Sequence, residues 1–216
     1  MSVIGKTWAY YREHGLVELA RRVHRRRRFH IYVRDLTAPA DVGAEDSEAR
    51  FTVATAEQAG LVARGLRHWG DQAEQSVRQL IGAGDLAVVG ITRVPPTKVV
   101  FVSWLSRRDP LLLTLHGETP PAGEICSRRI WVPTEHRRQG YARRGLRFAE
   151  QAAREAGYDR IWAFVIRNNK PSRRLHEQMG YDAYGVLRLG RVFGRRFAEL
   201  QRAGERRWQP LTPVEP

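Results

Sequence analysis

Hydrophobic and polar residues follow two different spacings along this chain, and each spacing predicts a type of element. Within residues 6–28, apolar side chains recur about every three or four positions, which predicts an amphipathic helix with a strongly basic end. The apolar run 29–33 is typical of an extended segment, and 37–49 is polar, contains proline and is typical of a linker. We therefore expect a basic helical extension over residues 1–34 and an acidic linker over 35–49.

From residue 50 onwards, strand and helix patterns alternate. The first part predicts strands at 51–54, 85–92, 98–105 and 124–132, helices at 56–68 and 72–82, and a strand at 111–115 as a candidate partner of 124–132. The second part predicts a helix at 140–156 closed by Gly157, a buried strand at 161–166, a helix at 171–179 ending at Gly180, and a strand pair at 182–193. This order predicts an α/β (α+β) fold with a mixed central β-sheet flanked by helices. The single domain is expected over residues 50–200, with a C-terminal tail at 201–216.

Length and composition limit the class of protein. The chain has 216 residues, 42% of them hydrophobic, which is enough to form a buried core. No apolar run approaches the roughly 18–20 residues that a membrane span needs, and the N-terminus lacks a signal-peptide pattern. Cys126 is the single cysteine, so the sequence excludes an internal disulfide and a cysteine-based zinc cluster. We therefore expect a cytoplasmic protein.

The net charge of +14 is unevenly distributed, with +7 over residues 1–34, −4 over 35–126 and +11 over 127–216. Such basic segments favour an anionic partner. Nucleic acid is the general interpretation, but zinc-finger spacing, an aromatic RNA-binding signature and a basic-zipper repeat are all lacking, so we consider it unlikely. A nucleotide cofactor fits the same charge, and so does peripheral contact of residues 1–34 with an anionic membrane. The predicted N-terminal helix could equally dock its apolar side chains on the main domain.

The stretch 130–142, Ile-Trp-Val-Pro-Thr-Glu-His-Arg-Arg-Gln-Gly-Tyr-Ala, combines a strand, a short loop and the start of a helix. The N-terminus of a helix binds anions because it offers unpaired N–H groups and the positive end of the helix dipole. Gly140 and Ala142 let a phosphate approach the backbone closely. Four arginines add positive charge nearby: Arg137, Arg138, Arg143 and Arg144. The residues alone predict a pyrophosphate site, with an ordinary basic helix cap as the alternative.

Two motifs in this half of the chain resemble those of one family. Val132-Pro133 followed by residues 137–142 is similar to the acyl-CoA pyrophosphate motif, Arg/Gln-x-x-Gly-x-Gly/Ala, of the GNAT N-acetyltransferases. A second block, in the expected order and distance, resembles the family's Asn-x-x-Ala/Ser…Leu-Tyr…Gly-Phe pattern: Asn169-Lys-Pro-Ser172, Leu175-His176 and Met179-Gly180-Tyr181. The resemblance covers residues 124–187 well, and 50–123 only in the order of the elements.

This resemblance implies a GNAT-like domain that binds acetyl-CoA, or another short acyl-CoA, as cosubstrate and needs no metal. It implies that backbone groups of Ile130, Trp131 and Val132 pair with the pantetheine arm and polarise the thioester carbonyl. Asn169 and Ser172 are expected beside the cofactor arm. The pyrophosphate is expected to lie on the turn formed by Arg137, Arg138, Gln139, Gly140, Tyr141 and Ala142.

The residues that would move protons depart from the family pattern. His176 stands where many members have the tyrosine proposed to protonate the departing thiolate, and it either serves as that acid or only lines the channel. The family's common position for a general base falls on Cys126, which is a poor base. Glu124 is the first candidate because strand alternation places it on the same face as Cys126. His116 and Glu118 are the next candidates.

The resemblance therefore implies an N-acyltransferase that transfers acetyl from acetyl-CoA to an amine by direct attack in a ternary complex. We expect the acceptor to be a primary amine on a small molecule, such as an amino sugar or a polyamine. A lysine or N-terminal amine of a protein is the alternative within the same chemistry. Because His176 replaces the tyrosine, a non-catalytic module that binds acyl-CoA or nucleic acid is the alternative from another class.

Overall fold

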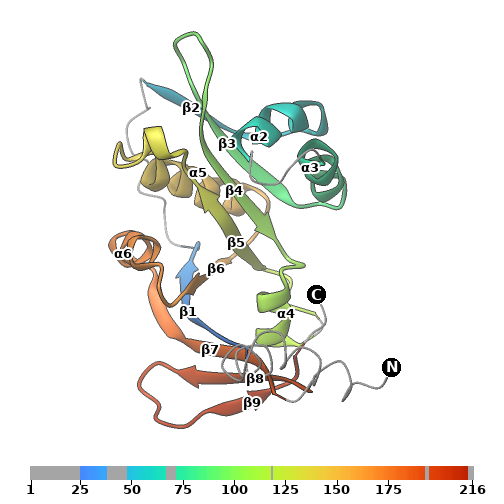
Figure 1. Cartoon of the computed structure of the whole chain (residues 1–216), viewed down its shortest axis with the longest axis vertical. Coiled ribbons are helices and arrows are strands. Elements are labelled where there is room, and N and C mark those ends of the chain that lie inside the picture. The colour runs from blue at the N-terminus through green and yellow to red at the C-terminus, as the bar shows by residue number, and fades with distance from the viewer. Residues whose placement is uncertain (1–24, 38–47, 67–71, 118, 193–194, 214–216) are drawn as a thin grey trace, which may run out of the picture.

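A computed structural model describes residues 25–37, 48–66, 72–117, 119–192 and 195–213. Its nine strands form one sheet in the order β2-β3-β4-β5-β6-β1-β7-β8-β9, in which only β5 and β6 are parallel neighbours (Figure 1). The strands are β1 (Arg25–Asp35), β2 (Ala49–Ala54), β3 (Leu86–Thr92), β4 (Val99–Ser106), β5 (Glu124–Trp131), β6 (Arg160–Ile166), β7 (Asp182–Val192), β8 (Arg195–Arg202) and β9 (Gln209–Leu211). The helices are η1 (Ala56–Gln58), α2 (Ala59–Gly65), α3 (Ala73–Gly82), α4 (Pro110–His116), η3 (Thr134–His136), α5 (Tyr141–Glu155) and α6 (Lys170–Gln178). The predicted fold class, a mixed sheet flanked by helices, is confirmed.

The helices cover opposite faces of the sheet. Alternate residues of β4 enter two different cores: Phe101 packs with Leu146 of α5, whereas Val102 packs with Val62 of α2 and Val77 of α3. This separation follows from the two-residue period of a strand, which sends neighbouring side chains to opposite faces. The face of the sheet that α5 covers and the face that α2 and α3 cover are therefore two distinct surfaces (Figure 1).

The main departure from the sequence-based prediction is β1. Residues 25–28 were expected to end a helix, and residues 1–34 to lie outside the domain. Instead β1 lies between β6 and β7 and is antiparallel to both, with Ile31 and Tyr32 at most 2% exposed. Its backbone is hydrogen-bonded on both sides by residues more than 120 positions away, which local periodicity cannot reveal. The predicted helix before residue 25 and most of the linker lie outside the described residues.

Two further elements differ from prediction. Residues 111–115 belong to the helix α4 and not to a strand, because Asp109 caps the helix by accepting from the Leu111 amide at 2.9 Å and Pro110 occupies its first turn. A short apolar run is compatible with both a strand and a helix, so the pattern of residues 111–115 predicted the wrong type of element. The expected strand pair at 182–193 is the single strand β7, which pairs with β8, and β9 lies within the expected tail. No helix in the described part of the chain is long and apolar enough to cross a membrane.

The place of β1 gives a prediction about truncation. We expect removal of residues 1–34 to abolish folding, because it takes an interior strand and its buried side chains out of the sheet. Circular dichroism should show loss of cooperative thermal unfolding, whereas removal of residues 1–24 leaves β1 in place and serves as the control. A truncated protein that lacks residues 1–34 but still unfolds cooperatively would contradict the prediction.

Candidate active site

The parallel strands β5 and β6 pair over only four residues each, Glu124 to Ser127 with Arg160 to Ala163. Beyond this point β5 is bulged: Arg129 has a φ of 56°, and the register with β4 shifts between Val102 and Trp104. A cleft of about 270 Å³ lies where the two strands separate. The break in pairing leaves backbone groups of β5 available to a ligand, which an unbroken sheet would not.

The lining of this cleft comes from both faces of the sheet. Ser172 and His176 belong to α6 and Asn169 precedes it, whereas Leu111 belongs to α4 and packs on the opposite face with Cys126. The remaining lining residues come from β1, β5, β6 and the loop before α4: Phe29, Asp109, Cys126, Ser127, Arg128, Arg129, Ile130, Ala163, Phe164, Val165 and Ile166. Residues from both faces of the sheet therefore meet at the point where the strands separate.

His176 is the most buried polar side chain of this cleft, with 1% of its surface exposed. Its Nδ1 lies 2.7 Å from the Ser172 carbonyl oxygen, which can only accept, so Nδ1 carries the proton. Nε2 is buried and has no hydrogen-bond partner among the described residues. The tautomer set by Ser172 therefore gives Nε2 a lone pair, and this atom is a proton acceptor.

The surroundings of His176 favour its neutral form. Its ring stacks on Tyr32 with 5.6 Å between centroids and meets the edge of Tyr181 at 4.9 Å. Burial in this aromatic site lowers the pKa of His176 below 6.5, although the hydrogen bond to Ser172 acts in the opposite direction. At neutral pH the imidazole is therefore uncharged and can accept a proton before it donates one.

Asn169 and Ser172 lie together at the start of α6. Asn169 caps the helix, because its side-chain oxygen accepts from the Ser172 amide at 3.2 Å, and both residues line the cleft beside His176. The structure thus brings together Asn169 and Ser172, expected at the cofactor arm, and His176, expected as the proton donor or as channel lining. Ile130 of β5 also lines the cleft, and Trp131 and Val132 follow it in the direction of α5.

The start of α5 has the backbone of an anion site. Gly140 caps the helix with a φ of 81°, and Arg138 also has a positive φ of 63°. Within the described structure, the amides of residues 138–142 donate to no backbone carbonyl, whereas those of Arg143 and Arg144 both donate to the Gly140 carbonyl. A row of unpaired donors at the positive end of a 15-residue helix is suited to a pyrophosphate.

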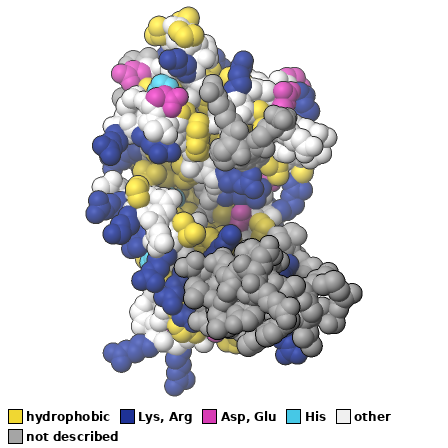
Figure 2. All heavy atoms as spheres, viewed as in Figure 1, with side chains coloured by type: hydrophobic (Ala, Val, Ile, Leu, Met, Phe, Trp, Pro, Cys, Tyr) yellow, Lys and Arg dark blue, Asp and Glu magenta, His cyan; other side chains and the backbone are white. Residues whose placement is uncertain are grey.

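The side chains around this turn are basic and mostly exposed (Figure 2). Arg144 lies over the ring of Tyr141, 4.5 Å from its centroid, and donates to the Gln139 carbonyl at 2.9 Å. Arg137 donates through Nε to the Val132 carbonyl at 3.2 Å. That carbonyl therefore already accepts one hydrogen bond, which leaves one lone pair for a second donor such as pantetheine.

Glu124 does not lie in the cleft. Its carboxylate is 8% exposed at the paired end of β5, where it accepts from Trp162 Nε1 at 2.7 Å and from Arg160 at 3.3 Å. His116 Nε2 lies 2.9 Å from the same carboxylate. With these partners Glu124 ties β5, β6 and α4 together, and its role as a general base stays a prediction. Cys126 does line the cleft, but burial raises the pKa of its thiol well above the usual value, and Glu118 lies outside the described residues.

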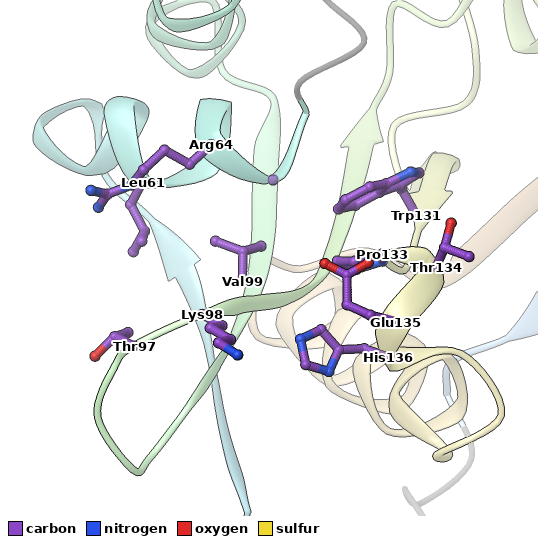
Figure 3. A pocket seen from close by; sticks show the side chains of 11 residues that line it. Leu61, Arg64, Thr97, Lys98, Val99, Trp131, Pro133, Thr134, Glu135 and His136 are labelled. Carbon is purple, nitrogen blue, oxygen red and sulfur yellow. The ribbon is translucent and has the colours of Figure 1, made fainter.

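A second cavity, of about 410 Å³, lies on the α2 side of the sheet. Figure 3 shows Arg64 of α2, Lys98 beside β4, and Glu135 and His136 of η3 around it, with Trp131 and Pro133 between the strand and η3. It shares no lining residue with the cleft between β5 and β6.

Among the described residues, no group of three or more His, Cys, Asp or Glu side chains could hold a metal ion.

Sequence reasoning missed the charged residues at the bulge. Arg128 pairs with Asp85 at 3.2 Å and with Asp109 at 3.5 Å, and Arg128, Arg129 and Asp109 all line the cleft. The only signal in the sequence is two consecutive arginines just before the motif. Arg128 and Arg129 lie together because the backbone of Arg129 has a positive φ. A positive φ at a residue other than glycine has no sequence signature.

Comparison with known proteins places this geometry in a family. Residues 87–181 match the model of the acetyltransferase (GNAT) family, and a search of curated proteins finds no match. Among solved structures, a Drosophila protein aligns with a TM-score of 0.57 at 15% identity, over 87% of this chain and 59% of its own. The GCN5-related N-acetyltransferase of Kribbella flavida aligns with a TM-score of 0.53 at 18% identity, over 82% of this chain and 64% of its own.

A glucosamine N-acetyltransferase region of a fungal multi-domain β-N-acetylglucosaminidase aligns with a TM-score of 0.57 at 15% identity, over 88% of this chain and 23% of that protein. This chain therefore spans less than two thirds of each of these three structures, and at these identities they show the shared fold alone. The family match covers β3 to α6, which includes the bulged β5, the start of α5 and the α6 side of the cleft. Over residues 87–181, this chain carries a domain of the GNAT acetyltransferase family.

Proposed function

We propose that this protein is an acyl-CoA-dependent N-acyltransferase that moves an acetyl group from acetyl-CoA to a primary amine of a small molecule. The observation that carries the proposal is the cleft between β5 and β6, which takes its lining from both faces of the sheet and includes His176, whose buried Nε2 has no hydrogen-bond partner among the described residues. Direct transfer needs both substrates at one point, and a cleft lined by residues from both faces of the sheet is suited to this.

Acetyl-CoA fits the α5–α6 side. The unpaired amides of residues 138–142 would hold the pyrophosphate, with exposed Arg138 and Arg143 adding charge. The arm would follow β5 past Ile130 towards Asn169 and Ser172. The bound thioester would supply the electrophilic carbonyl.

His176 would manage the proton in two steps. The amine nitrogen attacks the thioester carbon, and its proton passes to the lone pair of Nε2, directly or through water. The C–S bond then breaks, and Nε2–H returns the proton to the departing thiolate, leaving amide and free CoA. The Ser172 carbonyl keeps Nδ1 as the protonated nitrogen throughout and stabilises the imidazolium that forms between the steps.

This proposal gives His176 the role of base first and acid second. The sequence-based expectation divided these roles between Glu124 and His176, but Glu124 is already bonded away from the cleft. Peripheral membrane contact through residues 1–34 stays a prediction. It cannot use all of that segment as a free extension, since β1 lies within the sheet.

Release of thiol tests the proposal. Purified protein is incubated with acetyl-CoA and a panel of primary amines, and free CoA is measured with a thiol reagent, with product mass confirming the amide. We expect thiol release that depends on the amine. Binding of acetyl-CoA without release for any small amine, peptide lysine or peptide N-terminus would instead identify a non-catalytic acyl-CoA-binding module, and release with peptides alone would identify a protein acetyltransferase.

A further inference from the structure

An open cavity of about 970 Å³ lies on the α3 side of the sheet next to the cleft. Its charged lining residues are Asp85, Arg108, Arg128 and Arg129, and its neutral polar ones are Ser76, Gln79 and Ser106. Arg128 and Arg129 line the cleft as well, so the cavity and the cleft meet at these two residues. The acceptor therefore has an entrance opposite the α5–α6 side, and the entrance is lined with arginine.

The bulge explains why both arginines point into this cavity. In a regular strand, consecutive side chains lie on opposite faces, so one of the two would face α5. Arg129 has a φ of 56°, and this bulge places it beside Arg128 and α3. A residue other than glycine in this conformation costs free energy, which is typical of functional sites.

The single carboxylate in the cavity cannot serve a cationic ligand. Asp85 has a side chain only 2% exposed, and all its polar contacts are with the protein: it accepts from Ser106 at 2.7 Å and pairs with Arg108 at 3.3 Å and Arg128 at 3.2 Å. Asp85 thus holds two of the three guanidinium groups in place. Asp109 also pairs with Arg128, at 3.5 Å, so the three arginines face two carboxylates and one positive charge is in excess. Arg108, 56% exposed, and the exposed Arg129 lie at the surface of the cavity.

From this arrangement we infer that the acceptor amine carries an anionic group, a carboxylate or a phosphate, which Arg108 and Arg129 bind while the amine enters the cleft. Arginine suits such a group because its planar guanidinium donates two parallel hydrogen bonds to it. Desolvation and the like charge of Arg128 lower the pKa of Arg129, although the carboxylates of Asp109 and Asp85 act in the opposite direction. This inference rests on the proposed N-acyltransferase function and narrows its substrate away from amino sugars and polyamines.

Matched acceptor pairs test the inference. Each pair differs only in the anionic group: alanine and alaninamide, phenylalanine and phenylalaninamide, and phosphoethanolamine and ethanolamine. We expect kcat/KM to be at least about tenfold higher for the anionic member of at least one pair, at a pH that leaves the same fraction of both amines neutral. The amino-acid pairs report a carboxylate and the third pair reports a phosphate.

Variants show whether the arginines carry the preference. Arg108→Gln and Arg129→Gln should raise KM for the preferred acceptor about 10- to 100-fold while KM for acetyl-CoA stays constant, and Arg129→Lys should recover part of the loss. Arg78→Gln is the matched control, because Arg78 is on α3 but pairs with Glu74 and does not line the cavity.

The outcomes separate this inference from the proposed function. Equal turnover of charged and uncharged acceptors, or a preference for polyamines, overturns the inference and leaves the function intact. If no amine supports thiol release, the proposed function fails. In that case calorimetry with N-acetylalanine and N-acetylalaninamide, in the presence of CoA, still tests the cavity, and equal or absent binding of the two overturns the inference.

Discussion

Replacing His176 with phenylalanine is expected to lower kcat by about 10²- to 10⁴-fold, the usual range for loss of general acid–base catalysis. KM for acetyl-CoA should hardly change, because the lost proton transfers occur only in the transition state. Steady-state kinetics on the best amine acceptor measures both constants. The ring fills the same aromatic site between Tyr32 and Tyr181, and the lost hydrogen bond to Ser172 should cost only about 1 kcal/mol of folding free energy.

Two companion variants separate catalysis from packing. His176→Asn can keep a donor near the Ser172 carbonyl but lacks Nε2, so it should be as inactive as the phenylalanine variant. His176→Tyr should recover only part of the activity, because tyrosine, the usual residue of the family at this position, can protonate a thiolate but is too weak a base at neutral pH to accept the proton of the amine. If kcat is unchanged in the phenylalanine variant and KM for acetyl-CoA rises instead, His176 only lines the channel.

The pH dependence gives an independent test. The pKa of His176 lies below 6.5 in the folded protein, so Nε2 has its lone pair at neutral pH and loses it as the pH falls through that lowered value. With saturating substrates, kcat should therefore decline only below about pH 6.5, and this acid limb should be absent from the residual activity of the phenylalanine variant. Because protonation is opposed by burial, the same titration should also destabilise the fold as the pH falls below 6.5.

The sequence predicted the part of the site that depends on local structure. The start of α5 was placed within one residue, because the turn at Gly140 and the amphipathic pattern after it are both local signals. The same holds for α6, whose first turn is capped by Asn169 and presents Ser172 and His176 on one side. The spacing of these residues along a helix fixes their relative position whatever the rest of the chain does.

What the sequence could not predict depends on contacts between distant residues. The interior position of β1 is set by β6 and β7, and the burial of Glu124 depends on Trp162 and Arg160 on a neighbouring strand. In each case the local sequence pattern was also compatible with a different structure: an exposed helix end for the start of β1, and a free carboxylate for Glu124. Tertiary pairing decided the outcome, and a single sequence carries no record of such pairing.

The second large effect is expected at the α5 turn. We expect Gly140→Asp to weaken acetyl-CoA binding by about 10²- to 10³-fold, because it puts a carboxylate among the amides that would bind phosphate and removes the equivalent of about two charge-assisted hydrogen bonds. Calorimetry with acetyl-CoA measures the dissociation constant directly, without dependence on any acceptor.

The fold should tolerate this change, which makes the test specific. A Cβ at Gly140 would have only Arg144 within 4 Å, at 3.9 Å, and aspartate is a favourable cap that accepts the left-handed conformation better than most residues. Gly140→Asn is the matched control, since it has the same shape and the same backbone strain without the charge. We expect Asn to retain most of the affinity that Asp loses. Equal affinity of wild type and the aspartate variant would show that the pyrophosphate lies elsewhere, whereas equal losses in Asn and Asp would assign the effect to the backbone at φ 81° and not to charge.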